Sequence, residues 1–211
     1  MSRQNMNTES PYDYSTRTGV RPISWNDFHG LTKALAVAVS PWKPEIILPV
    51  GRGGYYPGSL LAHILQLEIY PVRLSRREQD IVVRESPQWI IAPPKSVNMR
   101  RVLVVDEICS TGETLIIVRD RTLSLGATEV RTAVLYAHVS GSGVPDYIGI
   151  ITDELVLNPW DREIYVNGEF RYHPEYVEAL VNQGGDVDQV LLIPSPKYVV
   201  EKGIESTRAS I

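Results

Sequence analysis

The stretch whose residue types most clearly suggest a binding or catalytic site is Val104–Leu115, which reads VVDEICSTGETL. Apolar residues predict a buried strand here, and that strand stops at two acids, Asp106 and Glu107. A Thr-Gly turn then opens a predicted helix, so free backbone N–H groups and the positive end of the helix dipole gather at this point. Such a turn suits a phosphate monoester, and the residues expected to bind it are Ser110, Thr111, Gly112, Glu113 and Thr114.

Two adjacent carboxylates beside a phosphate site need a ligand of their own. Vicinal hydroxyls of a sugar, with a divalent cation nearby, would suit both charges, and a ribose 5-phosphate supplies such hydroxyls. We therefore expect Asp106 and Glu107 to hold the ribose hydroxyls and to lie close to Mg²⁺. The loop is not a Walker loop, because the GxxxxGK[ST] spacing and its lysine are missing. A capped helix after a strand would explain Thr111 and Gly112 without a ligand, but it would not explain paired acids.

A second candidate loop lies in Ile47–Ala62, which reads ILPVGRGGYYPGSLLA. It consists of a predicted strand, a glycine-rich turn and an amphipathic helix. Consecutive glycines permit positive φ and aim N–H groups at an anion, and the arginine adds a fixed positive charge. Alone the pattern is a weak phosphate loop, but its strand belongs to the same predicted sheet as Asp106. The binding residues expected in this turn are Gly51, Arg52, Gly53 and Gly54.

The elements that must position these loops alternate along the chain between apolar β-branched runs and segments with helical spacing. The predicted strands are Ile46–Val50, Ile69–Leu74, Trp89–Ala92, Val102–Asp106 and Val130–Ala137. The predicted helices are Trp25–Val39, Pro57–Leu67 and Gly112–Leu125, the last with Gly126 as its C-cap. This alternation predicts an α/β fold, a mostly parallel twisted sheet flanked by helices, with ligands at the carboxyl ends of the strands.

One charged segment, Arg73–Lys95, interrupts the alternation. It is too polar for a core, and we expect Ile81–Val83 and Trp89–Ile91 to form a hairpin within it. A long charged loop in a compact domain is usually functional or disordered. The expected organisation is a disordered polar lead over residues 1–21, a core domain over 22–157, a small C-terminal subdomain or flap over 158–202 and a tail over 203–211.

Composition limits the function classes. The chain has 211 residues, of which 43% are hydrophobic, and a formal net charge of -4, which argues against a general nucleic-acid coat. No apolar run approaches the roughly 20 residues that span a bilayer, and the N-terminus lacks the apolar core of a signal peptide. We expect a soluble cytoplasmic protein without membrane or nucleic-acid partners. The single cysteine, Cys109, excludes an internal disulfide, and we expect it to be a buried neighbour of the loop.

These motifs resemble those of a known family. A hydrophobic strand, two acids, two variable residues and Thr-Gly-x-Thr resembles the phosphoribosyl-pyrophosphate motif of the type I phosphoribosyltransferases, and the Gly51–Gly54 turn resembles their pyrophosphate-binding loop. ISWNDFHGLTKALAVAV, WKPEIILPVGRGGYYPG and NPWD are similar to segments of the 6-oxopurine branch, the xanthine-guanine enzymes in particular, so that the resemblance covers about residues 23–165. It implies the type I phosphoribosyltransferase fold with Mg²⁺ as cofactor.

The chain departs from the 6-oxopurine pattern at three positions. The residue before the Thr-Gly is an aspartate in that branch, where it moves a proton at N7 of the base, and here it is Ser110. A lysine that reads the exocyclic oxygen of the purine corresponds to His138, which can donate or accept a hydrogen bond. The aromatic residue that stacks on the purine corresponds to Leu155, followed by Val156, so apolar contact remains without stacking.

The resemblance implies a glycosyltransferase of purine salvage that transfers ribose 5-phosphate from phosphoribosyl pyrophosphate to a purine-like base. Asp106, Glu107 and Arg52 are the expected catalytic residues, and no covalent intermediate is needed. The alternative is an inactive regulator of the same fold that senses a nucleotide or phosphoribosyl pyrophosphate. Relatives form homodimers or higher oligomers, and we expect the same here.

Overall fold

The computed structural model describes residues 17–75, 77–78, 81–82 and 87–184. Its centre is a parallel five-stranded sheet in the order β10-β9-β8-β2-β3. The strands of this sheet are β2 (Ile46–Pro49), β3 (Glu68–Ile69), β8 (Arg101–Cys109), β9 (Glu129–Ala137) and β10 (Tyr147–Ile151). The predicted α/β class with a parallel sheet is therefore confirmed.

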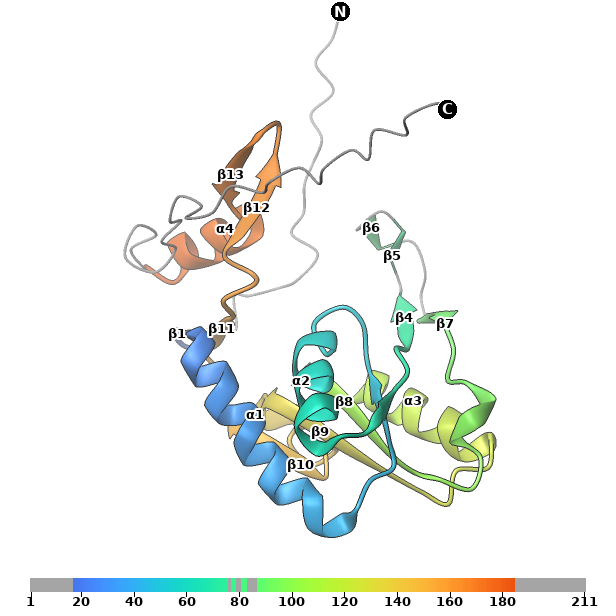
Figure 1. Ribbon diagram of the computed structural model, residues 1–211. Coiled ribbons are helices and arrows are strands. Elements are labelled where there is room, and N and C mark those ends of the chain that lie inside the picture. Colours follow the sequence, from blue (N-terminus) through green and yellow to red (C-terminus); the bar gives the residue numbers. More distant parts are fainter. Residues whose placement is uncertain (1–16, 76, 79–80, 83–86, 185–211) are drawn as a thin grey trace, which may run out of the picture.

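Helices cover both faces of the sheet (Figure 1). On one face α1 (Trp25–Val39) and α2 (Tyr55–Leu65) bury Phe28, Leu35 and Leu61 against the strands. On the other face α3 (Glu113–Ser124) buries Leu115 and Val118. Burial of these apolar side chains on both faces explains why the strands read as nearly continuous hydrophobic runs.

The predicted helices are present, and α1 has the predicted bounds. Its start is fixed by a capping box, in which the Ser24 hydroxyl accepts from the Asp27 N–H and the Asp27 carboxylate accepts from the Ser24 N–H. The predicted strand Ile69–Leu74 is wrong as one element. It is divided into β3 and β4 (Arg73–Ser75). The Tyr70 and Val72 N–H groups, on either side of Pro71, still donate to β2, and the chain then leaves the central sheet, so that β4 belongs to another sheet.

The hairpin expected in the charged segment is paired differently from the prediction. β4 pairs antiparallel with β7 (Gln88–Ile91), and β5 (Arg77–Glu78) pairs with β6 (Ile81–Val82). Ile81 and Val82 therefore lie in a different two-stranded sheet from their predicted partner Trp89–Ile91, and Val83 lies outside the described residues. Strand propensity identified these residues, but it carries no information on which strand pairs with which.

The C-terminal part begins at another two-stranded sheet, in which β11 (Leu155–Leu157) pairs in parallel with β1 (Val20–Pro22). The predicted boundary between residues 21 and 22 falls inside β1. Beyond β11 follow an antiparallel pair, β12 (Glu163–Val166) and β13 (Glu169–Tyr172), and α4 (Pro174–Asn182), which projects above the sheet in Figure 1. The predicted tail 203–211 and most of the predicted lead lie outside the described residues. Short 3-10 helices occupy Ser40–Trp42, Lys95–Val97 and Val139–Gly141.

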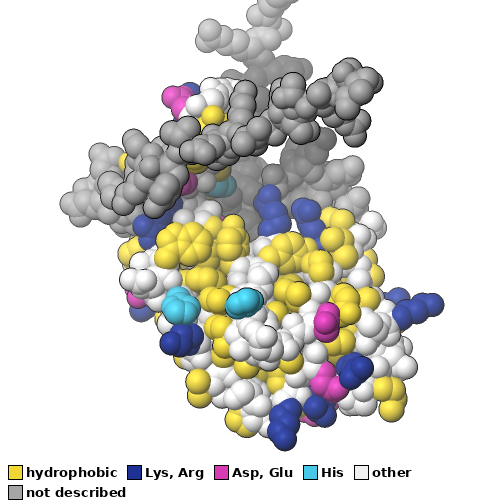
Figure 2. Space-filling view, in the orientation of Figure 1, with side chains coloured by type: hydrophobic (Ala, Val, Ile, Leu, Met, Phe, Trp, Pro, Cys, Tyr) yellow, Lys and Arg dark blue, Asp and Glu magenta, His cyan; other side chains and the backbone are white. Residues whose placement is uncertain are grey.

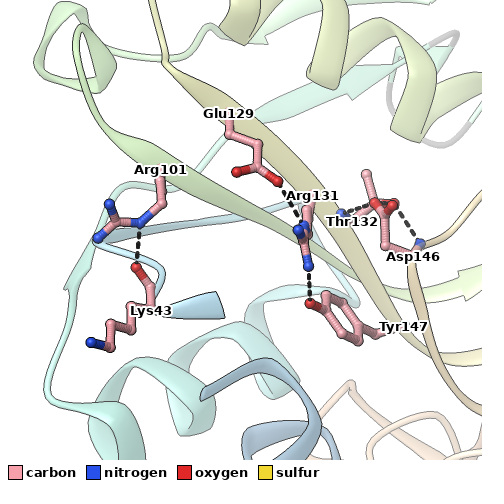
Figure 3. A network of polar contacts seen from close by, with 7 residues as sticks. All are labelled: Lys43, Arg101, Glu129, Arg131, Thr132, Asp146 and Tyr147. Atoms are coloured by element: carbon pink, nitrogen blue, oxygen red, sulfur yellow. Dashed lines mark hydrogen bonds and ion pairs between the residues drawn. The ribbon is translucent and has the colours of Figure 1, made fainter. Parts of the chain in front are cut away.

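Charged side chains at the amino ends of the strands form hydrogen bonds with neighbouring polar groups (Figure 3). Arg101 donates to the Lys43 carbonyl at 2.7 Å. Arg131 donates to Glu129 at 2.9 Å and to the Tyr147 hydroxyl at 2.8 Å. The Asp146 carboxylate accepts from both the N–H and the hydroxyl of Thr132. This edge of the sheet is held by matched polar groups.

The surface formed by α1 and α2 carries hydrophobic side chains across its upper part (Figure 2). The exposed hydrophobic side chains of these helices include Trp25, which is 57% exposed, and Tyr56, which is 41% exposed. No helix in the described part of the chain is long and apolar enough to cross a membrane.

Candidate active site

The expected site residues meet in one cavity at the carboxyl ends of the strands. Its volume is about 420 Å³, and all the site residues expected from the sequence line it except Gly54. They come from the loop after β2, the end of β8, the turn before α3, the end of β9 and β11. The predicted ligand-binding edge of the sheet is thus where these side chains converge.

The Gly51–Gly54 turn packs directly on the end of β8. A Cβ on Gly53 would lie 1.9 Å from the carboxyl carbon of Glu107, and one on Gly54 would lie 2.6 Å from the Val105 carbonyl oxygen. Only glycine fits at these positions because the turn touches the neighbouring strand. The turn is held by a hydrogen bond from the Gly51 N–H to the Val72 carbonyl at 2.8 Å, and the Gly51–Arg52 peptide bond is cis. Arg52 lines the cavity from the exposed side of this turn.

The two acids lie within β8, not after it. The strand was expected to stop at them, but it continues to Cys109 because β9 runs alongside and pairs Asp106 with Val134 and Cys109 with Ala137. Backbone pairing, not side-chain polarity, sets the end of the strand. Cys109 itself is buried, as expected, and its thiol contacts the Gly141 carbonyl.

The electrostatics of the acids are unusual. Burial raises the pKa of Asp106 to about 7. Burial first, and then the neighbouring charges of Asp161 and Asp106, raise the pKa of Glu107 to about 8. Burial also raises the pKa of Asp161. Carboxylates so close together are stabilised by a cation or by hydroxyl donors, and either kind of ligand would return their pKa values towards the ordinary range.

Two stacked aromatic side chains, Trp160 and Tyr56, lie beside Glu107. The Trp160 indole N–H donates to the Glu107 carboxylate at 3.3 Å. The Trp160 ring stacks on Tyr56 with 4.1 Å between ring centroids and an interplanar angle of 8°. Since Tyr56 belongs to the first turn of α2, this stack links the end of the glycine turn to the acid on β8.

The turn before α3 has the geometry of an anion site. Gly112 is the N-cap residue with φ 85°, a conformation that glycine adopts without strain. Ser110, Thr111 and Glu113 are exposed, and Thr114 is partly buried in the first turn of α3. The Glu113 N–H donates to the Thr111 hydroxyl at 3.4 Å, and the residues of this turn and of the first turn of α3 line the same cavity.

The third wall of the cavity is formed by His138, Leu155 and Val156, all buried. The His138 Nδ1 lies 2.8 Å from the Thr152 carbonyl oxygen. Burial, the largest cause, lowers the pKa of His138, so that its ring is neutral at pH 7. This wall can take a flat, largely apolar ring beside one polar contact.

Comparison with known proteins agrees with this geometry. The family model of the phosphoribosyl transferase domain matches residues 30–166. The chain belongs to this family. Its members are pentosyltransferases, a class of glycosyltransferases, and the fold is the type I phosphoribosyltransferase fold.

The chain is also similar to individual members of the family and to a solved structure. The chain is 24% identical over 164 residues to a xanthine-guanine phosphoribosyltransferase of Idiomarina loihiensis, which covers 76% of this chain and 92% of the relative. It is 29% identical over 111 residues to a hypoxanthine-guanine phosphoribosyltransferase of Saccharomyces cerevisiae, over 44% of this chain and 50% of the relative. The crystal structure of a purine phosphoribosyltransferase from Pyrococcus horikoshii superimposes with a TM-score of 0.63 at 28% identity, over 71% of this chain and 99% of that structure.

Several residues of this phosphoribosyltransferase-family cavity were not expected from the sequence, namely Arg17, Asn158, Asp161 and Tyr176. The Asn158 side chain donates to Asp161 at 3.0 Å, and a hydrogen bond with Tyr176 of α4 also lowers the pKa of Asp161. The NPWD motif contains two of these residues, Asn158 and Asp161, but its resemblance to the 6-oxopurine branch predicts no role for either. Arg17 and Tyr176 come from opposite ends of the described chain, and no local pattern indicates them.

Family members generally use Mg²⁺ together with phosphoribosyl pyrophosphate. Within the described residues, no group of three or more His, Cys, Asp or Glu side chains is arranged to hold a metal ion. The crowded oxygens of Asp106 and Glu107 nevertheless fit a hard cation that is bound mainly by substrate phosphates. We regard these carboxylates as the side chains that would face Mg²⁺.

Proposed function

We propose that this protein transfers ribose 5-phosphate from phosphoribosyl pyrophosphate to a purine-like base and releases pyrophosphate. One observation carries the proposal. Two strand-turn-helix loops suited to anions and a pair of strand-end acids line a single cavity, with Gly53 packed against the carboxyl group of Glu107. A ribose with phosphate groups at both ends needs this set of groups.

The binding roles follow from the chemistry of each wall. In this proposal the 5-phosphate accepts hydrogen bonds from Thr111, Thr114 and the first turn of α3. The pyrophosphate lies against the Gly51–Gly54 turn, where Arg52 supplies positive charge. Asp106 and Glu107 accept hydrogen bonds from the ribose hydroxyls when ionised, which their raised pKa values oppose in the absence of a ligand.

The reaction exchanges one bond at C1 of the ribose for another. A ring nitrogen of the base forms the new C–N bond while the C–O bond to pyrophosphate breaks, through a transition state that resembles an oxocarbenium ion. The negative charges of Asp106 and Glu107 favour this cationic ring, and Arg52 with the amides of its turn stabilises the leaving charge. When bound, Mg²⁺ neutralises charge on the pyrophosphate.

The class of base that the protein accepts is the most specific part of the proposal. The apolar pair Leu155 and Val156 suits a purine-like ring, and the named relatives act on xanthine, hypoxanthine and guanine. Ser110 offers no carboxylate to take a proton from N7, so the base must lose its proton to another acceptor.

The test is an assay of pyrophosphate release from phosphoribosyl pyrophosphate with Mg²⁺ and a panel of purine and pyrimidine bases. Base-dependent release that requires Mg²⁺ would support the proposal. Tight binding of phosphoribosyl pyrophosphate without release for any base would favour the alternative, a sensing regulator of the same fold. Thr111→Val with Thr114→Val would then test the phosphate loop, because loss of both hydroxyls should weaken binding of the 5-phosphate.

We further propose that the chain assembles as a homodimer or a higher homo-oligomer. Support comes from the exposed apolar side chains on α1 and α2, of which Val37 is 74% and Trp25 57% exposed. Light scattering at micromolar concentration should give a mass of two or more chains, and a strictly monomeric mass would contradict the proposal.

A further inference from the structure

His138 occupies a fixed position at the end of β9. Its backbone N–H donates to the Cys109 carbonyl at 2.9 Å, and its side chain is only 4% exposed. The ring forms part of the cavity wall beside Leu155 and Val156. A base that lies on this apolar wall therefore reaches a histidine held from two sides, by its backbone and by its ring.

The hydrogen bond of the ring determines its tautomer. A carbonyl oxygen can only accept, so the proton of the neutral ring must lie on Nδ1, which is 2.8 Å from the Thr152 oxygen. That carbonyl is itself held, because the Thr152 N–H donates to Ala137 at 2.9 Å and its hydroxyl donates to Glu154 at 2.8 Å. Nε2 is then left with a lone pair and is the ring nitrogen available to a ligand.

The charged groups around the ring keep it neutral on balance. Burial is the largest influence and lowers the pKa, and Arg17 lowers it further. The Thr152 carbonyl and Asp153, whose carboxylate lies 3.7 Å from Nδ1, act in the opposite direction but do not prevail. Glu154 is also close, but it is paired with Arg21 at 2.5 Å.

We propose that His138 determines base specificity by presenting Nε2 as a hydrogen-bond acceptor, so that the site favours a purine with an exocyclic amino group at position 6 over a 6-oxopurine. This inference rests on the proposed function and makes its base class specific. An amino group donates to Nε2, whereas a keto oxygen would place two acceptors against each other. A lysine at this position would give the reverse preference because it can only donate.

The first experiment is calorimetric titration of the parent protein with AMP and with IMP, which carry an amino and a keto group at position 6. AMP should bind about 10-fold or more tightly, because an acceptor that faces an acceptor leaves a buried group unsatisfied. Tighter binding of IMP would overturn the inference. Should that binding depend on Arg17, as judged with Arg17→Ala, the guanidinium would be the group that reads the base.

Two variants separate the role of Nε2 from that of the fold. His138→Asn places an amide N–H where Nδ1 donates to Thr152 but removes Nε2, so the preference for AMP should fall to within about 3-fold. His138→Lys should reverse the preference towards IMP, and His63→Lys, on the exposed side of α2, serves as the matched control that leaves it unchanged. An undiminished AMP preference in His138→Asn would refute the proposal.

The outcomes distinguish this inference from the proposed function. Pyrophosphate release that is fastest with hypoxanthine or guanine would leave the transferase function standing and remove the role of His138. Preferential AMP binding without pyrophosphate release for any base would keep the role of His138 and remove the transferase function. Binding of neither nucleotide would overturn the inference.

Discussion

At the two edges of the central sheet, the pKa values of carboxylates are shifted in opposite directions. At the amino edge a hydrogen bond from the Arg101 N–H, aided by Arg100, lowers the pKa of Glu45, and the nearby Trp42 indole N–H together with a hydrogen bond from Arg131 lowers that of Glu129. At the carboxyl edge burial raises the pKa of both Asp106 and Glu107. The same residue type is stabilised in its charged form at one edge and penalised at the other.

This difference shows which edge is arranged for the fold and which for a ligand. Paired charges at the amino edge satisfy one another and need nothing further. The acids at the carboxyl edge line a cavity, and burial penalises their charge despite a hydrogen bond from Trp160 to Glu107, so that a bound cation or hydroxyl group would stabilise them further. Perturbed carboxylates that cluster in a cleft are typical of functional sites.

The largest effect is expected when an acid of the carboxyl edge is neutralised. Asp106→Asn should lower turnover by about 100-fold or more, because an amide cannot offset charge on an oxocarbenium-like ring. The control is Asp146→Asn at the amino edge, which weakens the contact with Thr132. It should leave turnover unchanged and lower the free energy of unfolding by about 1 kcal/mol. Normal kinetics in Asp106→Asn would remove the ribose role from this residue.

A smaller loss of turnover is expected when a substitution displaces the Gly51–Gly54 turn from β8. Gly53→Ala should lower turnover by roughly 10- to 100-fold, because its Cβ would overlap the Glu107 carboxyl group and displace it. Gly30→Ala on α1 is the matched control, since nothing lies within 4 Å of a Cβ there. The control should raise the free energy of unfolding by about 0.5–1 kcal/mol. Steady-state kinetics and urea unfolding of both variants measure the contrast, and equal activities would contradict it.

A modest effect on turnover is expected when the Trp160 N–H that contacts Glu107 is removed. Trp160→Phe keeps a ring against Tyr56 but removes the N–H that lowers the pKa of Glu107. Turnover at pH 7 should fall by about 3- to 10-fold. The acid limb of the pH–rate profile should move to higher pH, since more base is needed to ionise Glu107. A uniform loss at all pH values would indicate a purely structural role for Trp160.

The smallest effect concerns stability and has opposite signs at the two edges. In the folded chain Asp106 keeps its proton up to about pH 7, whereas the unfolded chain releases it near pH 4, so stability falls as pH rises between these values. The stability of Asp106→Asn relative to the parent should therefore increase from pH 5 to pH 8, by roughly 2 kcal/mol.

Glu129→Gln provides the opposite case, because the folded pKa of Glu129 is lowered. Its contribution is present above the unfolded pKa and lost as pH falls, so this variant should be less stable than the parent at pH 7 and equal to it in acid. Urea unfolding at pH 3, 5, 7 and 8 compares the two variants, and the lowest pH is the one at which Glu129→Gln should match the parent. A gap for Asp106→Asn that stays constant with pH would show that its carboxyl is not perturbed.

The sequence predicted those parts of the fold that local pattern controls. Helical spacing located α1, and apolar β-branched runs located β2, β8 and β9. It failed where pairing is non-local, since β1 and β11 join residues far apart and β7 pairs with β4 instead of β6. It also failed between β3 and β4, where the chain leaves the central sheet and one predicted strand becomes two.

The site shows the same division. Asp106, Glu107, the Gly51–Gly54 turn and the turn before α3 lie in contiguous motifs. The chemistry of these motifs can be recognised from the sequence alone. Asp161 and Tyr176 reach the cavity only through the packing of β11 and α4, so no spacing in the sequence relates them to β8. The tautomer of His138 depends on the carbonyl of Thr152, which a sequence does not place beside it.

The most direct test of the ligand-binding edge is the number of protons released when phosphoribosyl pyrophosphate and Mg²⁺ bind. Calorimetry at pH 7.5 in buffers of different ionisation enthalpy measures this number for the parent and for Asp106→Asn. Ribose hydroxyls and a cation should lower the raised pKa values of Asp106 and Glu107, so the parent should release protons and the variant fewer. Equal proton release by both proteins, or proton uptake by the parent, would contradict the account.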